Sequence, residues 1–208
     1  MRLGIYGGSF SPIHLGHLLL AEACREYHRL DEVWFLPAAT SPLKQDFRMT
    51  SDAHRAAMVE LAIAGHDAFR MSRLELDRGG VSYTVDTLRD IQHQMPEAEL
   101  FLLVGADSIA DFPRWRAIEK ICSLAQVCAV GRTGYDLGDL SHLGGELSAA
   151  QIQRLRDHFV PMPLVEISSS DIRERLGSGR SIRYMVPRSV EKYIETQRVF
   201  SSQPSTGS

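Results

Sequence analysis

The chain has few cysteines, and their spacing gives them no structural role. Its 208 residues contain three, Cys24, Cys122 and Cys128. An odd number without CxxC spacing argues against a disulfide framework and against a zinc site, so we expect three buried apolar residues. Cys24 and His28 lie four apart on one expected helix and could share a metal ion, but ordinary helix packing is the favoured interpretation. No metal site is predicted.

Long apolar runs and an excess of basic charge are also missing. No segment approaches about 18 consecutive apolar residues, and residues 1–4 lead into an expected strand without the apolar region of a signal peptide. The net charge of −3 disfavours nucleic acid as a partner and favours a small anionic ligand. We therefore expect a cytoplasmic protein that binds neither membrane nor nucleic acid. Whether it forms a homo-oligomer stays open.

Two common phosphate-binding motifs are absent as well. The chain has no GxxxxGK[ST] sequence, so it is not a P-loop protein. It also has no GxGxxG sequence, which weakens the case for a hydride-transferring dinucleotide enzyme. Any phosphate must be bound by other means.

Short apolar runs alternate with segments of helical periodicity along most of the chain. This pattern predicts a parallel sheet covered on both faces, because parallel strands need long crossovers. The expected fold is α/β, a Rossmann-like doubly wound sheet with a small C-terminal helical part, in one domain over residues 1–198; residues 199–208 are an expected disordered tail. The expected strands are 3–6, 33–36, 71–76, 100–104, 127–130 and 165–167. The expected helices are 15–29, 52–64, 84–94, 109–122, 148–158, 172–176 and 187–197, with a loop over 132–142.

A glycine turn and two histidines follow the first expected strand. Gly7 and Gly8 let backbone N–H groups come close to a ligand, and the helix that begins near His14 adds partial positive charge. An anion is the natural occupant of such a turn. His14 and His17, three apart at the helix start, therefore indicate phosphate chemistry.

The stretch GGSFSPIHLGH at residues 7–17 resembles the GG[ST]FxPxHxGH signature of the nucleotidyltransferase superfamily, specifically of bacterial nicotinate-nucleotide adenylyltransferases. The resemblance implies that His14 and His17 are catalytic and contact the phosphates of ATP. It also implies that the turn binds ATP through Gly7, Gly8, Ser9 and Phe10. Ser11 stands where many members carry aspartate, and we expect its hydroxyl to make a side-chain-to-backbone turn bond.

Three further segments resemble the ATP-binding parts of that family. ISSSDIR at residues 167–173 is similar to its ISSTxIR motif, and hydroxyls and N–H groups at a helix start with an arginine one turn in can hold a triphosphate. Residues 105–115 resemble GxDxxxxxxxW, and the position after the fifth expected strand resembles a basic one. The implied ATP-binding residues are Ser168, Ser169, Ser170, Arg173, Gly105, Asp107 and Arg132.

The acceptor-binding residues are also implied by resemblance. Lys44 closes a PxxxxPxK loop whose lysine contacts the mononucleotide phosphate in the family. Tyr83 and Thr84 belong to an SYTxxTL segment that helps bind the pyridine ring and its carboxylate. Trp115 offers an aromatic ring for stacking on nicotinate.

Taken together, the resemblance implies adenylyl transfer from ATP to nicotinate mononucleotide, giving nicotinate adenine dinucleotide and pyrophosphate in NAD biosynthesis. ATP is a substrate, and Mg²⁺ is expected to arrive on its phosphates. Nicotinamide mononucleotide and phosphopantetheine remain alternative acceptors. A non-catalytic nucleotide-binding regulator is the alternative from another class.

Overall fold

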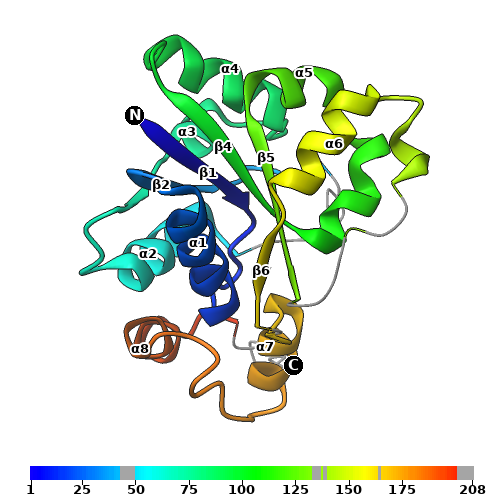
Figure 1. The fold of residues 1–208 in the computed structure, drawn as a ribbon. Coiled ribbons are helices and arrows are strands. Elements are labelled where there is room, and N and C mark those ends of the chain that lie inside the picture. The colour runs from blue at the N-terminus through cyan, green and yellow to red at the C-terminus, as the bar shows by residue number, and fades with distance from the viewer. Residues whose placement is uncertain (43–49, 133–136, 138–139, 164, 201–208) are drawn as a thin grey trace.

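The computed structural model describes residues 1–42, 50–132, 137, 140–163 and 165–200. Within these residues, six parallel strands form one sheet in the order β3-β2-β1-β4-β5-β6 (Figure 1). The strands are β1 (Arg2–Gly8), β2 (Glu32–Pro37), β3 (Phe69–Met71), β4 (Glu99–Gly105), β5 (Gln126–Arg132) and β6 (Val160–Met162). The order reverses direction between β1 and β4, and such a switch point opens a crevice beyond the carboxyl ends of the strands. The doubly wound α/β fold is confirmed.

Helices cover both faces of this sheet (Figure 1). Alternate residues of β4 serve opposite faces, because Phe101 and Leu103 join the core under α1, α2 and α8, whereas Leu100 and Leu102 join the core under α4, α5 and α6. The helices are α1 (Leu15–His28), α2 (Asp52–Ile63), α3 (Leu74–Arg78), α4 (Thr84–Gln94), α5 (Ile118–Leu124), α6 (Ala149–Asp157), α7 (Ser169–Gly177) and α8 (Arg188–Gln197), with 3₁₀ helices η1 (Ala106–Arg114) and η2 (Ser141–Leu143).

Both edge strands differ from the prediction. The expected strand 71–76 is wrong, because β3 ends at Met71 and Leu74 already begins α3. The expected strand 165–167 is also wrong, because β6 lies at Val160–Met162 instead. Pro161 lies in β6, and an edge strand tolerates a residue that cannot donate a ladder hydrogen bond.

The expected helix over residues 109–122 is divided in two. The 3₁₀ helix η1 ends at Arg114, and α5 begins only at Ile118. Between them Ala117 takes a left-handed backbone conformation with φ 54°, which interrupts any continuous helix. The break leaves Trp115 and Arg116 in a turn beyond the carboxyl end of β4.

The three cysteines lie in the hydrophobic core or pack against it. Cys24 and Cys128 are buried and Cys122 is half-buried, and burial raises the pKa of the Cys122 thiol to about 11.

In the described ranges no three His, Cys, Asp or Glu side chains are grouped as for a metal ion, and no helix there is long and apolar enough to cross a membrane. Val199 is buried, so the packed chain extends past residue 198; residues 201–208 lie outside the described residues.

Candidate active site

The turn between β1 and α1 is shaped by a buried phenylalanine. Phe10 has φ 44°, and its ring lies under Gly8, where an added Cβ would come within 3.0 Å of it. A side chain at Gly8 would therefore force the Phe10 ring to move by a few tenths of an ångström. Phe10 also packs edge-on against Tyr6, with ring centroids 5.5 Å apart, which anchors the turn to β1.

His14 and His17 lie against each other at the start of α1. Their ring centroids are 3.6 Å apart. His17 Nδ1 accepts a hydrogen bond of 3.2 Å from the backbone N–H of His14. A neutral imidazole that accepts at Nδ1 carries its proton on Nε2, so this bond assigns Nε2–H as the donor of His17.

The side chain of His14 is buried, and one of its ring nitrogens lacks a hydrogen-bond partner. Its Nδ1 is one of the buried polar atoms that find no partner in the described part of the chain. Burial lowers the pKa of His14 to about 4, so the ring is neutral at neutral pH. Gly16 lets the ring lie this close, because a Cβ there would be 3.1 Å from Nδ1. A buried polar atom without a partner is costly, and a ligand at this turn can relieve that cost.

The start of α7 contacts the same turn, as the sequence predicted for its two motifs. Ser169 Oγ donates to the carbonyl of Pro12 at 2.8 Å, and Arg173 Nη1 donates to the carbonyl of Ser11 at 2.8 Å. These pairs are 157 and 162 residues apart in the sequence. Ser168 caps α7 by accepting from the N–H of Asp171 at 3.0 Å. The N-terminus of α7 is thus held beside the N-terminus of α1.

Two details of this contact refine the sequence interpretation. Arg173 Nη2 also donates to Ser170 Oγ at 3.1 Å, so the guanidinium joins the turn to the first turn of α7. The turn bond expected of Ser11 is wrong, because its buried hydroxyl oxygen has no partner among the described residues. Its carbonyl, which accepts from Arg173, makes the contact instead.

Arg55 supports the turn between β1 and α1 through hydrogen bonds, and the sequence interpretation missed this residue. Its side chain is fully buried and donates to the carbonyls of Ser9 at 3.0 Å and Thr50 at 3.2 Å, and it pairs with the carboxylate of Asp52. In the sequence, Asp52 and Arg55 form an i,i+3 pair of opposite charge, which is typical of a solvated helix face. Only the long-range contact with Ser9 shows the role of Arg55.

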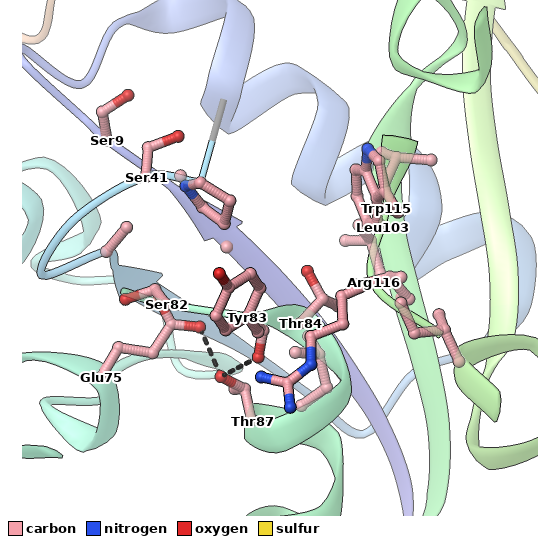
Figure 2. A pocket seen from close by; sticks show the side chains of 18 of the residues that line it. Ser9, Ser41, Glu75, Ser82, Tyr83, Thr84, Thr87, Leu103, Trp115 and Arg116 are labelled. Atoms are coloured by element: carbon pink, nitrogen blue, oxygen red, sulfur yellow. Dashed lines mark hydrogen bonds between the residues drawn. The ribbon is translucent and has the colours of Figure 1, made fainter. Parts of the chain in front are cut away.

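A cavity of about 170 Å³ opens beside the turn, beyond the carboxyl ends of β1, β2 and β4 (Figure 2). Gly7, Gly8 and Ser9 line one side of it. The beginning of α4 lines another, and Figure 2 shows Tyr83 and Thr84 there, with Trp115 across from them. The cavity therefore joins the proposed ATP turn to the proposed acceptor residues.

Gly7 faces this cavity directly. A Cβ built at Gly7 has no atom within 4 Å, and the residue lines the cavity. Gly7→Ala should therefore leave the thermal unfolding midpoint unchanged while its methyl group occupies ligand space and lowers kcat/KM by about tenfold, a clash of roughly 1.4 kcal/mol. The matched control is Gly145→Ala, which also meets nothing within 4 Å but does not line the cavity. Equal activity of the two variants would contradict the placement of ligand over Gly7.

The segment before α4 is tied to the loop after β2. Ser82 Oγ accepts from the N–H of Ala39 at 3.0 Å, and the N–H of Ser82 donates to the carbonyl of Thr40 at 2.9 Å. Tyr83 occupies the N-cap position and Thr84 is the first residue of α4. Since the first N–H groups of a helix point out of its N-terminus, they supply donors and partial positive charge at this end of the cavity.

Glu75 is a second residue that the sequence interpretation missed. It lines the cavity from α3 and is buried; burial raises the pKa of its carboxyl, while hydrogen bonds with Thr87 and Ser82 oppose the rise. Thr87 Oγ1 donates to Glu75 Oε1 at 2.7 Å (Figure 2). It also accepts from Arg78 at 2.9 Å. This network connects the first turn of α4 to α3.

Trp115 lies in the turn after η1. Its ring is 4.9 Å from the ring of Phe112, and its buried Nε1 has no partner in the described part of the chain. Gly105, which ends β4, has an ordinary extended backbone with φ −66°, so no conformational need explains this glycine. Asp107 follows in η1, and Arg132 ends the neighbouring strand β5. Lys44 lies outside the described residues.

The sheet order and the turn between β1 and α1 define an α/β nucleotidyltransferase. Residues 5–175 match the cytidylyltransferase-like family. The structure is similar to that of Plasmodium falciparum nicotinic acid mononucleotide adenylyltransferase complexed with NaAD, with a TM-score of 0.75, 20% identity, and coverage of 96% of this chain and 97% of that one. The complex of the same enzyme with APC gives a TM-score of 0.73 at 19% identity, covering 96% of both chains. At these identities the likeness concerns the fold.

Relatives in sequence show which family of nucleotidyltransferases the chain belongs to. A Rhodopirellula baltica protein named "Probable nicotinate-nucleotide adenylyltransferase" is 42% identical over 198 residues, covering 95% of this chain and 92% of that protein. A protein of the same name from Thermomicrobium roseum is 44% identical over 193 residues, covering 93% and 88%. The chain belongs to the bacterial nicotinate-nucleotide adenylyltransferase family.

Proposed function

We propose that the protein transfers the adenylyl group of ATP to nicotinate mononucleotide, giving nicotinate adenine dinucleotide and pyrophosphate in cytoplasmic NAD biosynthesis. The observation that carries the proposal is the contact between the β1–α1 turn and α7. It joins the histidine pair, of which His14 is buried, two helix N-termini and Arg173 around one place. This arrangement suits a triphosphate, because N–H groups, helix dipoles and a guanidinium all favour anions.

The reaction needs charge stabilisation more than proton transfer. The phosphate of the acceptor is an anion at neutral pH, so one of its oxygens can attack the α-phosphorus of ATP without a general base. The bond between the α-phosphorus and the oxygen that bridges to the β-phosphorus then breaks, and pyrophosphate leaves. Catalysis therefore rests on alignment of the acceptor and on groups that stabilise the growing negative charge.

His14 and His17 are proposed as the catalytic residues. Nε2–H of His17 donates to a phosphate oxygen, and the hydrogen bond strengthens as charge builds up there. His14, neutral because of its burial, contributes a polar ring without repelling the cationic groups around the triphosphate. The other proposed ATP-binding residues are Gly7, Gly8, Ser9, Phe10, Gly105, Asp107, Arg132, Ser168, Ser169, Ser170 and Arg173.

Mg²⁺ is proposed to enter with ATP. It is a hard cation that prefers oxygen ligands and keeps much of its water shell, so the phosphates themselves can carry it. When bound, it would neutralise charge on the departing pyrophosphate. Hydrogen-bond donors at the turn and at α7 would hold the phosphate oxygens that the metal leaves available.

The acceptor is proposed to bind in the cavity between α4 and Trp115. N–H groups at the start of α4, next to Tyr83 and Thr84, suit the pyridine carboxylate. Trp115 stacks on the ring, and Lys44 binds the acceptor phosphate. Gly7 and Gly8 belong to the turn and also line the cavity, which supports the binding of the two substrates next to each other.

Trp115→Ala should raise KM for nicotinate mononucleotide by about tenfold and change KM for ATP much less. The physical reason is the loss of ring stacking, worth roughly 1 to 1.5 kcal/mol, on the acceptor side only. Steady-state kinetics with each substrate varied in turn measure the two constants. Equal increases in both would contradict stacking on the acceptor.

The function is tested by pyrophosphate release from ATP with separate acceptors. Nicotinate mononucleotide, nicotinamide mononucleotide and phosphopantetheine are each offered at equal concentration. The proposal expects the fastest release with nicotinate mononucleotide. Faster release with either other acceptor would replace the substrate, and no release with any of the three would favour a nucleotide-binding regulator.

A further inference from the structure

Three charged residues lie among the described residues that line the cavity: Glu75, Arg114 and Arg116. The carboxylate of Glu75 is occupied by the hydroxyl of Thr87 at 2.7 Å. Arg114 is hydrogen-bonded to Asp111 at 3.2 Å. Arg116 differs from both because it forms no hydrogen bond with the described residues.

The guanidinium of Arg116 lies over the face of Tyr83, 4.8 Å from the ring centroid. Its ion pair with Asp86 is 3.5 Å long, beyond the usual length of a charge-assisted hydrogen bond, and the described residues offer it no hydrogen bond. Figure 2 shows this guanidinium near Tyr83, the residue that precedes α4. Several N–H donors of Arg116 are therefore available to a ligand at this end of the cavity.

We infer that Arg116 is a specificity-determining residue, which makes the site prefer an acceptor whose ring bears a carboxylate over one bearing a carboxamide. This inference rests on the proposed function. The two acceptors differ by one negative charge and are otherwise nearly the same size. The partial positive charge at the start of α4 favours a carboxylate, but its N–H donors can also bond a carboxamide oxygen, so a full positive charge nearby strengthens the preference for the acid.

Asp86 makes the positive charge of Arg116 more important. It lies in the first turn of α4, where its carboxylate would repel a second carboxylate at the helix N-terminus. Arg116 and Arg89 share this carboxylate, at 3.5 Å and 3.4 Å. Of these two arginines only Arg116 lines the cavity, so Arg116 both offsets Asp86 and faces the acceptor.

The test compares kcat/KM for nicotinate and nicotinamide mononucleotide at saturating ATP in the full-length protein. Arg116→Met keeps an apolar stem over Tyr83 and removes the charge. It is expected to lower the ratio of kcat/KM for the acid to kcat/KM for the amide by about tenfold. The change should come from a higher KM for the acid, with KM for ATP unchanged. The size of the effect is that of one charge partly screened by solvent, because the side chain of Arg116 is 59% exposed. Arg116→Lys, which keeps the charge, should restore most of the ratio.

Arg89→Met is the matched control, because it removes the other partner of Asp86 from outside the cavity and should leave the ratio unchanged. Added salt should lower the ratio in the unmodified protein and have less effect on Arg116→Met. Arg116→Gln takes the place of Arg116→Met if the latter does not fold by circular dichroism.

The outcomes separate this inference from the proposed function. An unchanged ratio, or equal losses with both acceptors, in a folded Arg116 variant overturns the inference and leaves the proposed function intact. Failure of the unmodified protein to turn over either acceptor overturns the proposed function and the inference with it. A ratio that falls equally in Arg89→Met also overturns the inference, since Asp86 alone would then account for the effect.

Discussion

His17→Ala is expected to lower kcat for pyrophosphate release by roughly 10² to 10³, the scale of losing one preorganised donor at a developing negative charge. The hydrogen bonding of His17 determines which of its ring nitrogens carries the proton. Because His17 Nδ1 accepts from the backbone N–H of His14 at 3.2 Å, the proton lies on Nε2. Catalysis loses that donor, whereas the fold loses a local hydrogen bond and the ring contacts with Phe10 and His14 at the start of α1.

The measurement is steady-state kinetics together with thermal unfolding. His93→Ala is the matched control, since it removes an exposed imidazole in the last turn of α4, away from the cavity. It should match the unmodified protein in both assays. His17→Ala should unfold within a few degrees of it, because the loss of one hydrogen bond and of ring contacts at a partly buried position costs about 1 to 2 kcal/mol. Normal turnover of His17→Ala would remove the histidine from the mechanism.

The elements that the sequence predicted well are those whose signals are local. Helix α4 has the predicted bounds, Thr84–Gln94, because its apolar residues recur with helical periodicity and bury one side of the helix. The β1–α1 turn was predicted from its glycines and histidines, and its contact with α7 from the pairing of two motifs. Edge strands β3 and β6 were misplaced because runs this short carry no reliable periodicity.

The features that the sequence did not reveal depend on partners distant in the chain. The sequence predicts Glu75 in a strand, yet the residue lies in α3 and its carboxyl group contacts Thr87, 12 residues away on α4. The acidity and burial of that carboxyl cannot be inferred from its neighbours in the sequence. The pairing of Arg116 with Tyr83 is of the same kind, because it exists only where the turn after η1 meets the start of α4.

Arg55 provides the strictest test of how the turn is supported. Arg55→Met keeps most of the side-chain volume but removes the donors to the carbonyls of Ser9 and Thr50, which lie 3.0 and 3.2 Å away. Two partly buried carbonyls and the carboxylate of Asp52 then lose this partner, so the free energy of unfolding should fall by roughly 2 to 3 kcal/mol. Chemical denaturation followed by circular dichroism measures the change.

The matched control for this variant is Arg25→Met on α1. Arg25 also pairs with an acidic residue three positions earlier, Glu22, but both side chains are about one-third exposed. Its loss should cost at most about 1 kcal/mol, the scale of a surface pair. Activity adds a second readout, because Ser9 lines the cavity while Arg25 does not. Arg55→Met should therefore lower kcat/KM under conditions where the variant is fully folded, whereas Arg25→Met should not. Equal destabilisation of the two variants would mean that Arg55 is an ordinary helix ion pair and that the glycine turn holds its shape without it.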